Sequence, residues 1–145
     1  MAASGDHVVA VAAAFARNLT TGSTTSAGYI VALPTAGACG VAFVAPPSGK
    51  VTIAYGTAGF NSGANDNKTA VRVGTSATVG GGSEVYGATD NDMILFTGAA
   101  TYGIGRVTEV SGLTPGDPYN AALAHRAGAG TASFLFRTIK VIPDI

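Results

Sequence analysis

The feature that most constrains the fold is a turn near the end of the chain, in the stretch VSGLTPGDPYNAALAHR at residues 110–126. Pro115 fixes its own φ at about −65°, and Gly116 can supply the positive φ that the next turn position requires. Leu113 can close the end of a core, and Tyr119 enters the following strand with a ring that can be buried. The tyrosine hydroxyl can then bond a backbone carbonyl a few residues upstream. We therefore predict a structural corner that joins strands of two different sheets.

Short segments of alternating polarity surround this corner. Val51, Ile53 and Tyr55 fall on one face of such a segment, which is the period-two pattern of a half-buried strand. Turn residues recur roughly every 8–12 positions, as they do in sandwiches and barrels. We predict an all-β fold, an antiparallel β-sandwich in which most consecutive strands, including those within residues 41–56, are linked as hairpins. The candidate strands are residues 39–45, 50–55, 69–74, 83–87, 92–98, 104–110, 119–126 and 133–142.

The last of these strands alternates most clearly. Its pattern predicts that Phe134 and Phe136 share one face, while Arg137 and Ile139 share the other. The Gly-rich pieces VGGGSE and RAGAGTAS each join two candidate strands, so both are predicted to be hairpin turns.

The chain divides into two predicted parts. Residues 1–38 form an N-terminal arm or peripheral strands, and residues 39–145 form the β-sandwich domain. The apolar run at residues 8–16 is too short to span a bilayer as a helix, which needs about 20 residues. Asp6 and His7 precede it, so it lacks the basic region of a signal peptide. We expect no membrane partner.

The charge balance narrows the class of partner. Only 11% of the residues are charged, and eight Lys and Arg balance eight Asp and Glu, against roughly 25% charged residues in ordinary soluble domains. A neutral surface gives no electrostatic footprint for nucleic acid. It also does little to keep copies of the chain apart. We therefore expect no nucleic-acid partner and a homo-oligomer.

No catalytic or metal-binding pattern appears in the sequence. It lacks the Gly-x-Ser-x-Gly elbow, the phosphate-binding loop and the His-Glu-x-x-His motif. The single Cys39 sits among small and apolar residues, and two histidines cannot complete a zinc cage with it. The oxygen-rich loops at residues 61–68 and 89–93 lack the layout of a calcium-binding EF-hand. We predict a protein without enzymatic activity, cofactor or metal.

Two carboxylates and one histidine are further candidates for a chemical role. Glu84 and Glu109 would have to lie close together to act as the acid and base of a glycosidase, but any two carboxylates could be paired in this way. His125, on the face of Tyr119 and Leu123, is more readily a structural histidine at the rim of the sandwich than a base or ligand.

The corner resembles a known device. The spacing Leu-x-Pro-Gly-x-x-Tyr, formed by Leu113, Pro115, Gly116 and Tyr119, is similar to the E–F corner of fibronectin type III domains, a tyrosine corner. The chain has no tryptophan, which that family usually carries, and one cysteine cannot form an immunoglobulin disulfide. The resemblance implies an immunoglobulin or fibronectin III-like sandwich.

A longer stretch, residues 41–143, resembles small virion proteins of tailed phages of actinobacteria. The shared pattern is an early Pro-Pro-x-Gly-Lys-Val stretch, the Gly-Leu-Thr-Pro-Gly corner, a Tyr-led strand ending in His-Arg, and a last strand with Arg then Val-x-Pro. The resemblance implies a bacteriophage virion structural protein, located in the particle and bound to other virion proteins and copies of itself. It leaves open a minor tail or particle-surface subunit and a capsid decoration protein that stabilises the head. The matching residues are Pro46, Pro47, Gly49, Lys50, Val51, Gly112 to Gly116, Tyr119, His125, Arg126 and Arg137.

Candidate contact residues follow from the same strands. Arginines recur on the last strands and, if they share a sheet face, can contact a neighbouring subunit; the possible interface residues are Arg106, Arg126, Arg137 and Phe60. The alternative function is a carbohydrate-binding β-sandwich module for host-surface adhesion, with a host-surface glycan as partner. Its candidate aromatic residues are Tyr55, Phe60, Tyr86 and Tyr102.

Overall fold

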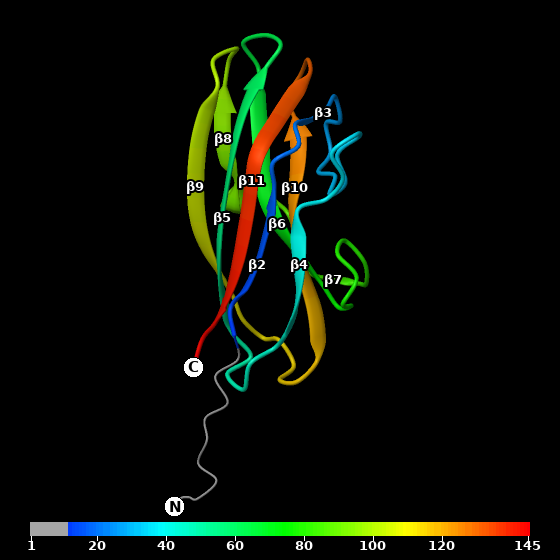
Figure 1. Cartoon of the computed structure of the whole chain (residues 1–145), viewed down its shortest axis with the longest axis vertical. Helices are drawn as coiled ribbons and strands as arrows, with labels where there is room; N and C mark the ends of the chain where they lie inside the picture. Colours follow the sequence, from blue (N-terminus) through cyan, green and yellow to red (C-terminus); the bar gives the residue numbers. More distant parts are fainter. Residues whose placement is uncertain (1–11) are drawn as a thin grey trace, which may run out of the picture.

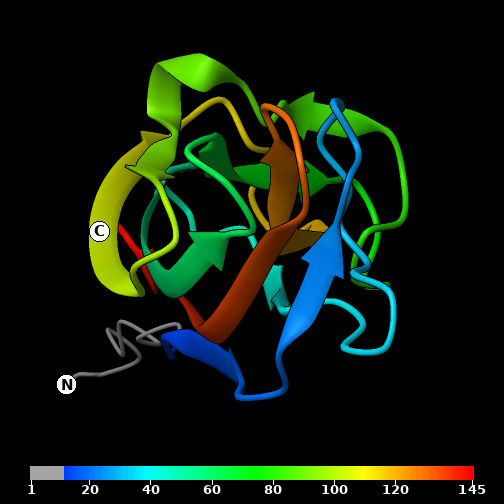
Figure 2. The same ribbon diagram turned by 90° about the horizontal axis from the view of Figure 1, so that it is seen from above.

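The computed structural model describes residues 12–145. His7 and the first part of the apolar run at residues 8–16 therefore lie outside the described residues. The described chain forms two antiparallel β-sheets that pack face to face and are elongated along their strands (Figures 1 and 2). The predicted all-β antiparallel sandwich is confirmed.

Each sheet is built from strands that are distant in the sequence. Sheet I has the order β4-β10-β6, and β7 and β8 both pair with the free edge of β6. Sheet II has the order β2-β11-β5-β9, and β3 also pairs with β11. The strands of sheet I are β4 (Gly40–Val44), β6 (Asp66–Gly74), β7 (Glu84–Tyr86), β8 (Ile94–Thr97) and β10 (Pro118–Ala127). Those of sheet II are β2 (Ala14–Asn18), β3 (Gly22–Thr24), β5 (Val51–Asn61), β9 (Tyr102–Val110) and β11 (Ala132–Pro143), and a 3-10 helix, η1 (Asp90–Asp92), precedes β8.

Most connections cross from one sheet to the other. The hairpin predicted within residues 41–56 is wrong, because β4 belongs to sheet I and β5 to sheet II. The Gly-rich turn between β10 and β11 also crosses, whereas β6 and β7 do form a hairpin. Crossing lets the apolar face of each strand meet the opposite sheet. The strand order is that of a jelly-roll sandwich, so the likeness to fibronectin domains lies in the two layers and the corner.

The described part of the N-terminal segment lies along both sheets. β2 and β3 pair with β11 at one edge of sheet II. Residues 26–39 then follow β10 in sheet I, where Ile30 and His125 exchange backbone hydrogen bonds of 2.9 and 2.8 Å. Further along, the Leu123 N–H donates to the Cys39 carbonyl at 2.9 Å. The segment therefore continues the sheet edge that β4 provides.

The turn between β9 and β10 crosses the end of the sandwich. Leu113 and Tyr119 are buried, and Gly116 has a φ of 83°. The Tyr119 hydroxyl accepts a hydrogen bond of 2.9 Å from the Thr114 N–H, where the sequence had suggested a bond to a carbonyl. Its ring stacks on Phe43 of β4 at a centroid distance of 5.9 Å. The corner covers this end of the core.

A β-bulge in β11 changes which of its residues face the core. The register against β5 shifts between Leu135 and Thr138, so Phe136 and Arg137 together occupy one position of the ladder. Phe136 has a φ of 51° and is 57% exposed, whereas Arg137 is fully buried. The predicted common face of Phe134 and Phe136 is therefore wrong, because the bulge turns Phe136 outward and Arg137 inward.

The buried Arg137 fastens the N-terminal segment to the sandwich. Its guanidinium donates hydrogen bonds to the carbonyls of Gly37 at 3.1 Å and Ala36 at 3.4 Å. The Asn18 amide of β2 also donates to the Ala36 carbonyl, at 2.7 Å. One turn of backbone is thus held by side chains from two strands of sheet II.

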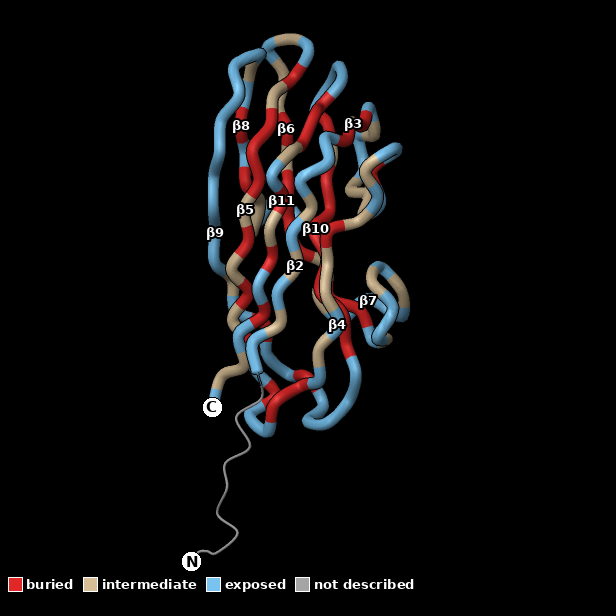
Figure 3. Tube along the Cα trace, in the orientation of Figure 1, coloured by how far each residue is buried: buried red, intermediate tan, exposed pale blue. Residues whose placement is uncertain are grey.

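Buried residues lie along both sheets (Figure 3), and most of them are apolar. The ring of Phe134 lies 4.3 Å from that of His125 and 6.0 Å from that of Phe96, measured between centroids. A Cβ on Gly59 would lie 2.5 Å from both Phe96 and the Ser133 carbonyl oxygen, so only glycine fits where β5 passes this cluster. The largest fully buried apolar side chains are Leu33, Val51, Ile53, Val71, Val73, Ile94, Leu123, Phe134, Ile139 and Val141.

The corner generates a stability prediction. We expect Tyr119→Phe to lower the free energy of unfolding by about 1 kcal/mol, because it removes one hydrogen bond and leaves the ring in place. Tyr102→Phe is the matched control, since the Tyr102 side chain is 52% exposed and its hydroxyl has no hydrogen bond to the described residues. Urea unfolding of both variants measures the difference. Equal stability of the two variants would show that the hydroxyl of Tyr119 contributes nothing.

Candidate functional site

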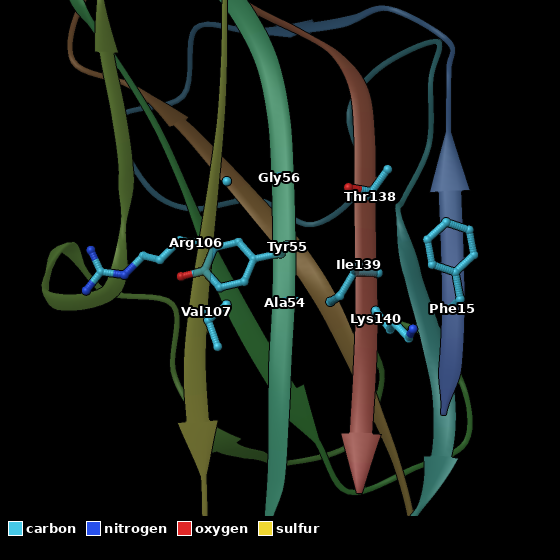
Figure 4. Close-up of a pocket in the computed structure, with 10 residues that line it drawn as sticks. Phe15, Ala54, Tyr55, Gly56, Arg106, Val107, Thr138, Ile139 and Lys140 are labelled. Atoms are coloured by element: carbon cyan, nitrogen blue, oxygen red, sulfur yellow. The ribbon is translucent and has the colours of Figure 1, made fainter. Parts of the chain in front are cut away.

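An open groove of about 570 Å³ crosses the outer face of sheet II (Figure 4). Its floor consists of small residues of β5 and β9, namely Ala54, Gly56 and Gly105. Phe15 of β2 stands at one side and Val107 of β9 at the other. Neighbouring strands lie about 4.8 Å apart, so the four strands from β2 to β9 set a width of about 14 Å.

Two polar side chains of β11 rise from the groove between its apolar sides. The register places Lys140 beside Phe15 and Thr138 beside Arg17. Phe15 is 55% exposed and Val107 is 62% exposed, so both apolar side chains face solvent. Apolar surface with a few polar groups is the usual composition of a ligand site.

Gly105 of β9 keeps the groove open, although no close contact requires a glycine there or at Gly103. The nearest atom to a Cβ on Gly105 would be a carbonyl oxygen at 3.6 Å, and on Gly103, one row along, the Cβ of Ala58 at 4.0 Å. Both are ordinary contact distances, and neither glycine has a positive φ. Gly56 differs, because its Cβ would lie 3.1 Å from the Ile104 carbonyl oxygen. Glycine weakens a strand, so Gly103 and Gly105 carry a cost that packing does not explain.

Arg106, one of the predicted interface residues, holds the turn before β8. Its guanidinium donates to the carbonyls of Met93 at 3.1 Å and Asn91 at 3.2 Å, and it lies 3.4 Å from the Asp92 carboxylate. The Tyr86 hydroxyl also donates a hydrogen bond to that carboxylate. Most of the hydrogen-bonding capacity of this arginine is therefore used inside the chain.

Arg126 belongs to a second network, on the outer face of sheet I. It lies 3.6 Å from the Asp90 carboxylate and 5.5 Å from the centroid of the Tyr29 ring. Asp90 also accepts hydrogen bonds of 2.8 Å from Lys68 and from the Tyr29 hydroxyl. These two donors lower the pKa of Asp90 below its usual 3.8, and burial raises the pKa of Tyr29. The carboxylates of η1 are thus occupied by cations.

The predicted interface residues do not share a face. Arg137 is wholly buried, so the prediction that it contacts a partner is wrong: the bulge in β11 points it into the core. Phe60 is half-buried on β5, near one end of sheet II. Arg106 and Arg126 lie on different sheets.

The aromatic residues predicted for sugar binding do not supply the exposed ring of the groove, and Phe15, which the sequence analysis missed, does. Of the predicted residues, Tyr55 is buried, its hydroxyl donates to the Asp92 carbonyl, and burial raises its pKa to about 12. Tyr86 is tied to the same aspartate, and Tyr102 lies on the opposite face of β9 from Val107. The ring in the groove is that of Phe15. Its segment AFARN begins with three apolar residues, so no period-two alternation marked Phe15 as an exposed strand residue.

The remaining polar candidates do not converge on a reactive centre. Glu84 pairs with Arg72 of the neighbouring strand at 3.5 Å, in sheet I, whereas Glu109 is exposed on β9 of sheet II. In the oxygen-rich loop at residues 61–68, the Asn61 amide donates to the Asn67 side chain at 2.8 Å.

Within residues 12–145, no helix is long and apolar enough to cross a membrane.

His125 is a core residue, not a rim residue as predicted. It is completely buried, and its Nδ1 lies 2.8 Å from the Thr69 hydroxyl oxygen. Its Nε2 has no hydrogen-bond partner among the described residues. Burial, with a smaller contribution from the positive charge of Arg137, holds the pKa of His125 well below its usual 6.5. The lowered pKa favours the neutral imidazole at pH 7.

Comparisons with known proteins identify the fold and no family. No protein family matches the chain, and no curated protein matches it. Among solved structures, Eiger TNF from S. frugiperda is similar with a TM-score of 0.55 at 11% identity, over 94% of each chain. This likeness extends to the sandwich alone.

Two further structures are similar at a lower level. The CBM36-1 domain of a multidomain xylanase from the hindgut metagenome of Trinervitermes trinervoides has a TM-score of 0.43 and 12% identity, over 92% of this chain and 99% of that domain. The enzymatically active domain of tailspike protein 4 of bacteriophage CBA120 has a TM-score of 0.41 and 11% identity, over 90% of this chain and 19% of the tailspike chain.

Because His125 is buried, we predict that the free energy of unfolding depends on pH. The folded pKa of His125 is lowered, so the unfolded state binds the proton more readily, and stability is lost as the pH falls below the unfolded value of about 6.5. We expect the free energy of unfolding to fall by at most about 1.4 kcal/mol per pH unit in this range. Asp90 adds a separate loss only near and below its usual pKa of 3.8.

Urea unfolding between pH 8 and pH 4.5, in steps around the unfolded pKa of about 6.5, measures the effect. The control is His125→Gln, which keeps a hydrogen-bonding group for Thr69 and removes the titration. A pH dependence of the same size in both proteins would contradict the assignment to His125.

Proposed function

We propose that this chain is a non-catalytic binding module, and that the groove on sheet II binds an extended carbohydrate. The observation that carries the proposal is the floor of the groove, where Gly105 stands in β9 although no close contact requires a glycine there. Departures from local preference that packing does not explain are expected at functional sites.

The chemistry of the groove suits a sugar chain. A pyranose ring presents C–H faces that pack on an aromatic ring, and Phe15 offers a ring that is more than half exposed. Sugar hydroxyls both donate and accept hydrogen bonds, and Thr138 and Lys140 project into the same groove. The groove is open and crosses four strands, so it suits a polymer better than an enclosed small molecule.

A glycan array followed by calorimetry on the best ligand tests this proposal. We expect Phe15→Ala to weaken binding about tenfold, equivalent to about 1.4 kcal/mol, because stacking on the ring is lost. Gly105→Val should abolish binding by filling the floor, while a β-branched residue leaves the strand at least as stable. The matched control is Phe136→Ala, since Phe136 is 57% exposed on the same sheet and does not line the groove.

Two results would overturn the carbohydrate proposal. One is an array without reproducible binding by the folded protein. The other is a bound glycan whose affinity is the same in wild type, Phe15→Ala and Gly105→Val, which would place the site elsewhere.

A second candidate function is that of a structural subunit of a phage particle, as a minor tail protein, a surface subunit or a capsid decoration protein. It is favoured by the zero net charge and by the large apolar side chains left exposed on sheet II, which are Phe15, Val107, Phe136 and Ile142. Large apolar side chains gathered on one exposed sheet face are typical of protein contacts. The similarity of residues 41–143 to virion proteins points in the same direction.

Particles that lack this chain distinguish the second candidate from the first. We expect the purified protein to bind such particles stoichiometrically, and a map of the intact particle to place it on the tail or the head. Particle binding that Gly105→Val leaves intact would separate assembly from carbohydrate recognition, because that variant fills the groove and keeps the exposed apolar side chains of sheet II. Absence of binding to particles would leave the carbohydrate proposal as the one supported.

A further inference from the structure

β9 is an edge strand with an uncovered outer side. It pairs with β5 along its whole length, from Tyr102 opposite Gly59 to Val110 opposite Val51. It pairs with no other strand of the described chain. Both Figure 1 and Figure 2 show it as the outermost strand of sheet II, and Figure 3 shows it exposed along most of its length. Its backbone can therefore accept another strand.

The edge has few of the features that usually prevent such pairing. Natural edge strands are protected by charged side chains, especially lysine, by proline, by bulges or by shortness. The charged residues of β9 are Glu109 and Arg106, and the Arg106 guanidinium is hydrogen-bonded to the turn before β8. β9 is nine residues long, contains neither proline nor lysine, and keeps an unbroken register with β5. Three of its apolar side chains are exposed: Val107 (62%), Tyr102 (52%) and Ile104 (38%).

We propose that β9 pairs antiparallel with β9 of a second copy, about a twofold axis at Val107, so that the two sheets II form one continuous sheet. This goes beyond the proposed function, because it stands whatever the groove binds.

Charge selects this register among the twofold alternatives. An axis at Arg106 would give the longest overlap but would set Arg106 opposite itself, and like charges directly opposite are destabilising. An axis at Gly105 would set glycine against glycine, which adds no side-chain contact. With the axis at Val107, Glu109 lies opposite Gly105 and Arg106 opposite Thr108.

The same register brings apolar side chains together. Val107 meets Val107 of the second copy on the groove side, a β-branched pair that favours strand pairing. Ile104 lies opposite Val110 on the other side, where Val110 is already buried in the core of its own copy. The chain carries no net charge, so no long-range repulsion opposes the approach of two copies. A second copy of this chain can therefore pair with the free backbone N–H and C=O groups of β9 without any other partner.

Analytical ultracentrifugation of the full chain tests the proposal. We expect wild type to sediment as a concentration-dependent dimer of twice the 14.2 kDa chain. Val107→Lys and Val107→Glu should each be monomeric, because the axis sets each new charge opposite itself. An equimolar mixture of the two variants should dimerise again, since opposite charges then face each other. Amide exchange of β9 should be slow in wild type and in the mixture, and fast in each variant alone.

Val85→Lys and Val85→Glu are the matched controls, because Val85 is 48% exposed on β7, in the other sheet. They should dimerise like wild type. Circular dichroism checks that every variant is folded. A wild type that is monomeric up to millimolar concentration, an oligomer that survives both Val107 substitutions, or a mixture that fails to reassociate would each overturn the proposal. Carbohydrate binding is measured separately on Phe15→Ala, which leaves β9 unchanged, so the two proposals can fail independently.

Discussion

The bulge in β11 is the constraint on which much of this structure depends. One extra residue reverses the facing of the strand, so that Phe134, Arg137 and Ile139 all point inward. Without the bulge, the guanidinium of Arg137 would face solvent. With it, the guanidinium reaches the carbonyls of Ala36 and Gly37 and holds the N-terminal segment against both sheets.

The burial of Arg137 has an energetic consequence for its surroundings. No salt bridge to this arginine is formed by the described carboxylates, so backbone carbonyl dipoles are its partners. Its uncompensated charge also acts on His125, whose pKa it helps to lower. A buried charge satisfied only by neutral groups is costly, and this cost is offset by the packing of the surrounding core.

The sequence predicted the elements of this fold better than their connections. Period-two patterns located most strands, because alternation follows directly from a half-buried sheet. Strand pairing depends on which distant edges meet, and no local pattern encodes that β4 joins β10 instead of β5. The bulge was also invisible, since SFLFRTIKVI alternates regularly through Phe136 and Arg137. A local sequence pattern does not show where pairing with a neighbouring strand shifts the register, and so does not show which residues after the bulge face the core.

The candidate site was likewise predictable from the sequence only in part. The aromatic side chains proposed for sugar binding were chosen by residue type, and burial removed Tyr55 from that set. Phe15 was hidden inside a run of alanines and valines. A groove that spans β2, β11, β5 and β9 is a product of the sheet order, so only the assembled sheet reveals it.

The glycine floor of the groove has a consequence for how such a protein can change over time. Every glycine codon lies one nucleotide away from codons for alanine, valine and an acidic residue. At Gly105 in the floor, and at Gly103 one row along, an added Cβ would meet no neighbour closer than an ordinary contact distance. The depth and polarity of this surface can therefore be altered by single mutations that leave the backbone in place. Descendants of one ancestral sandwich could diverge in what they recognise while remaining identical in fold.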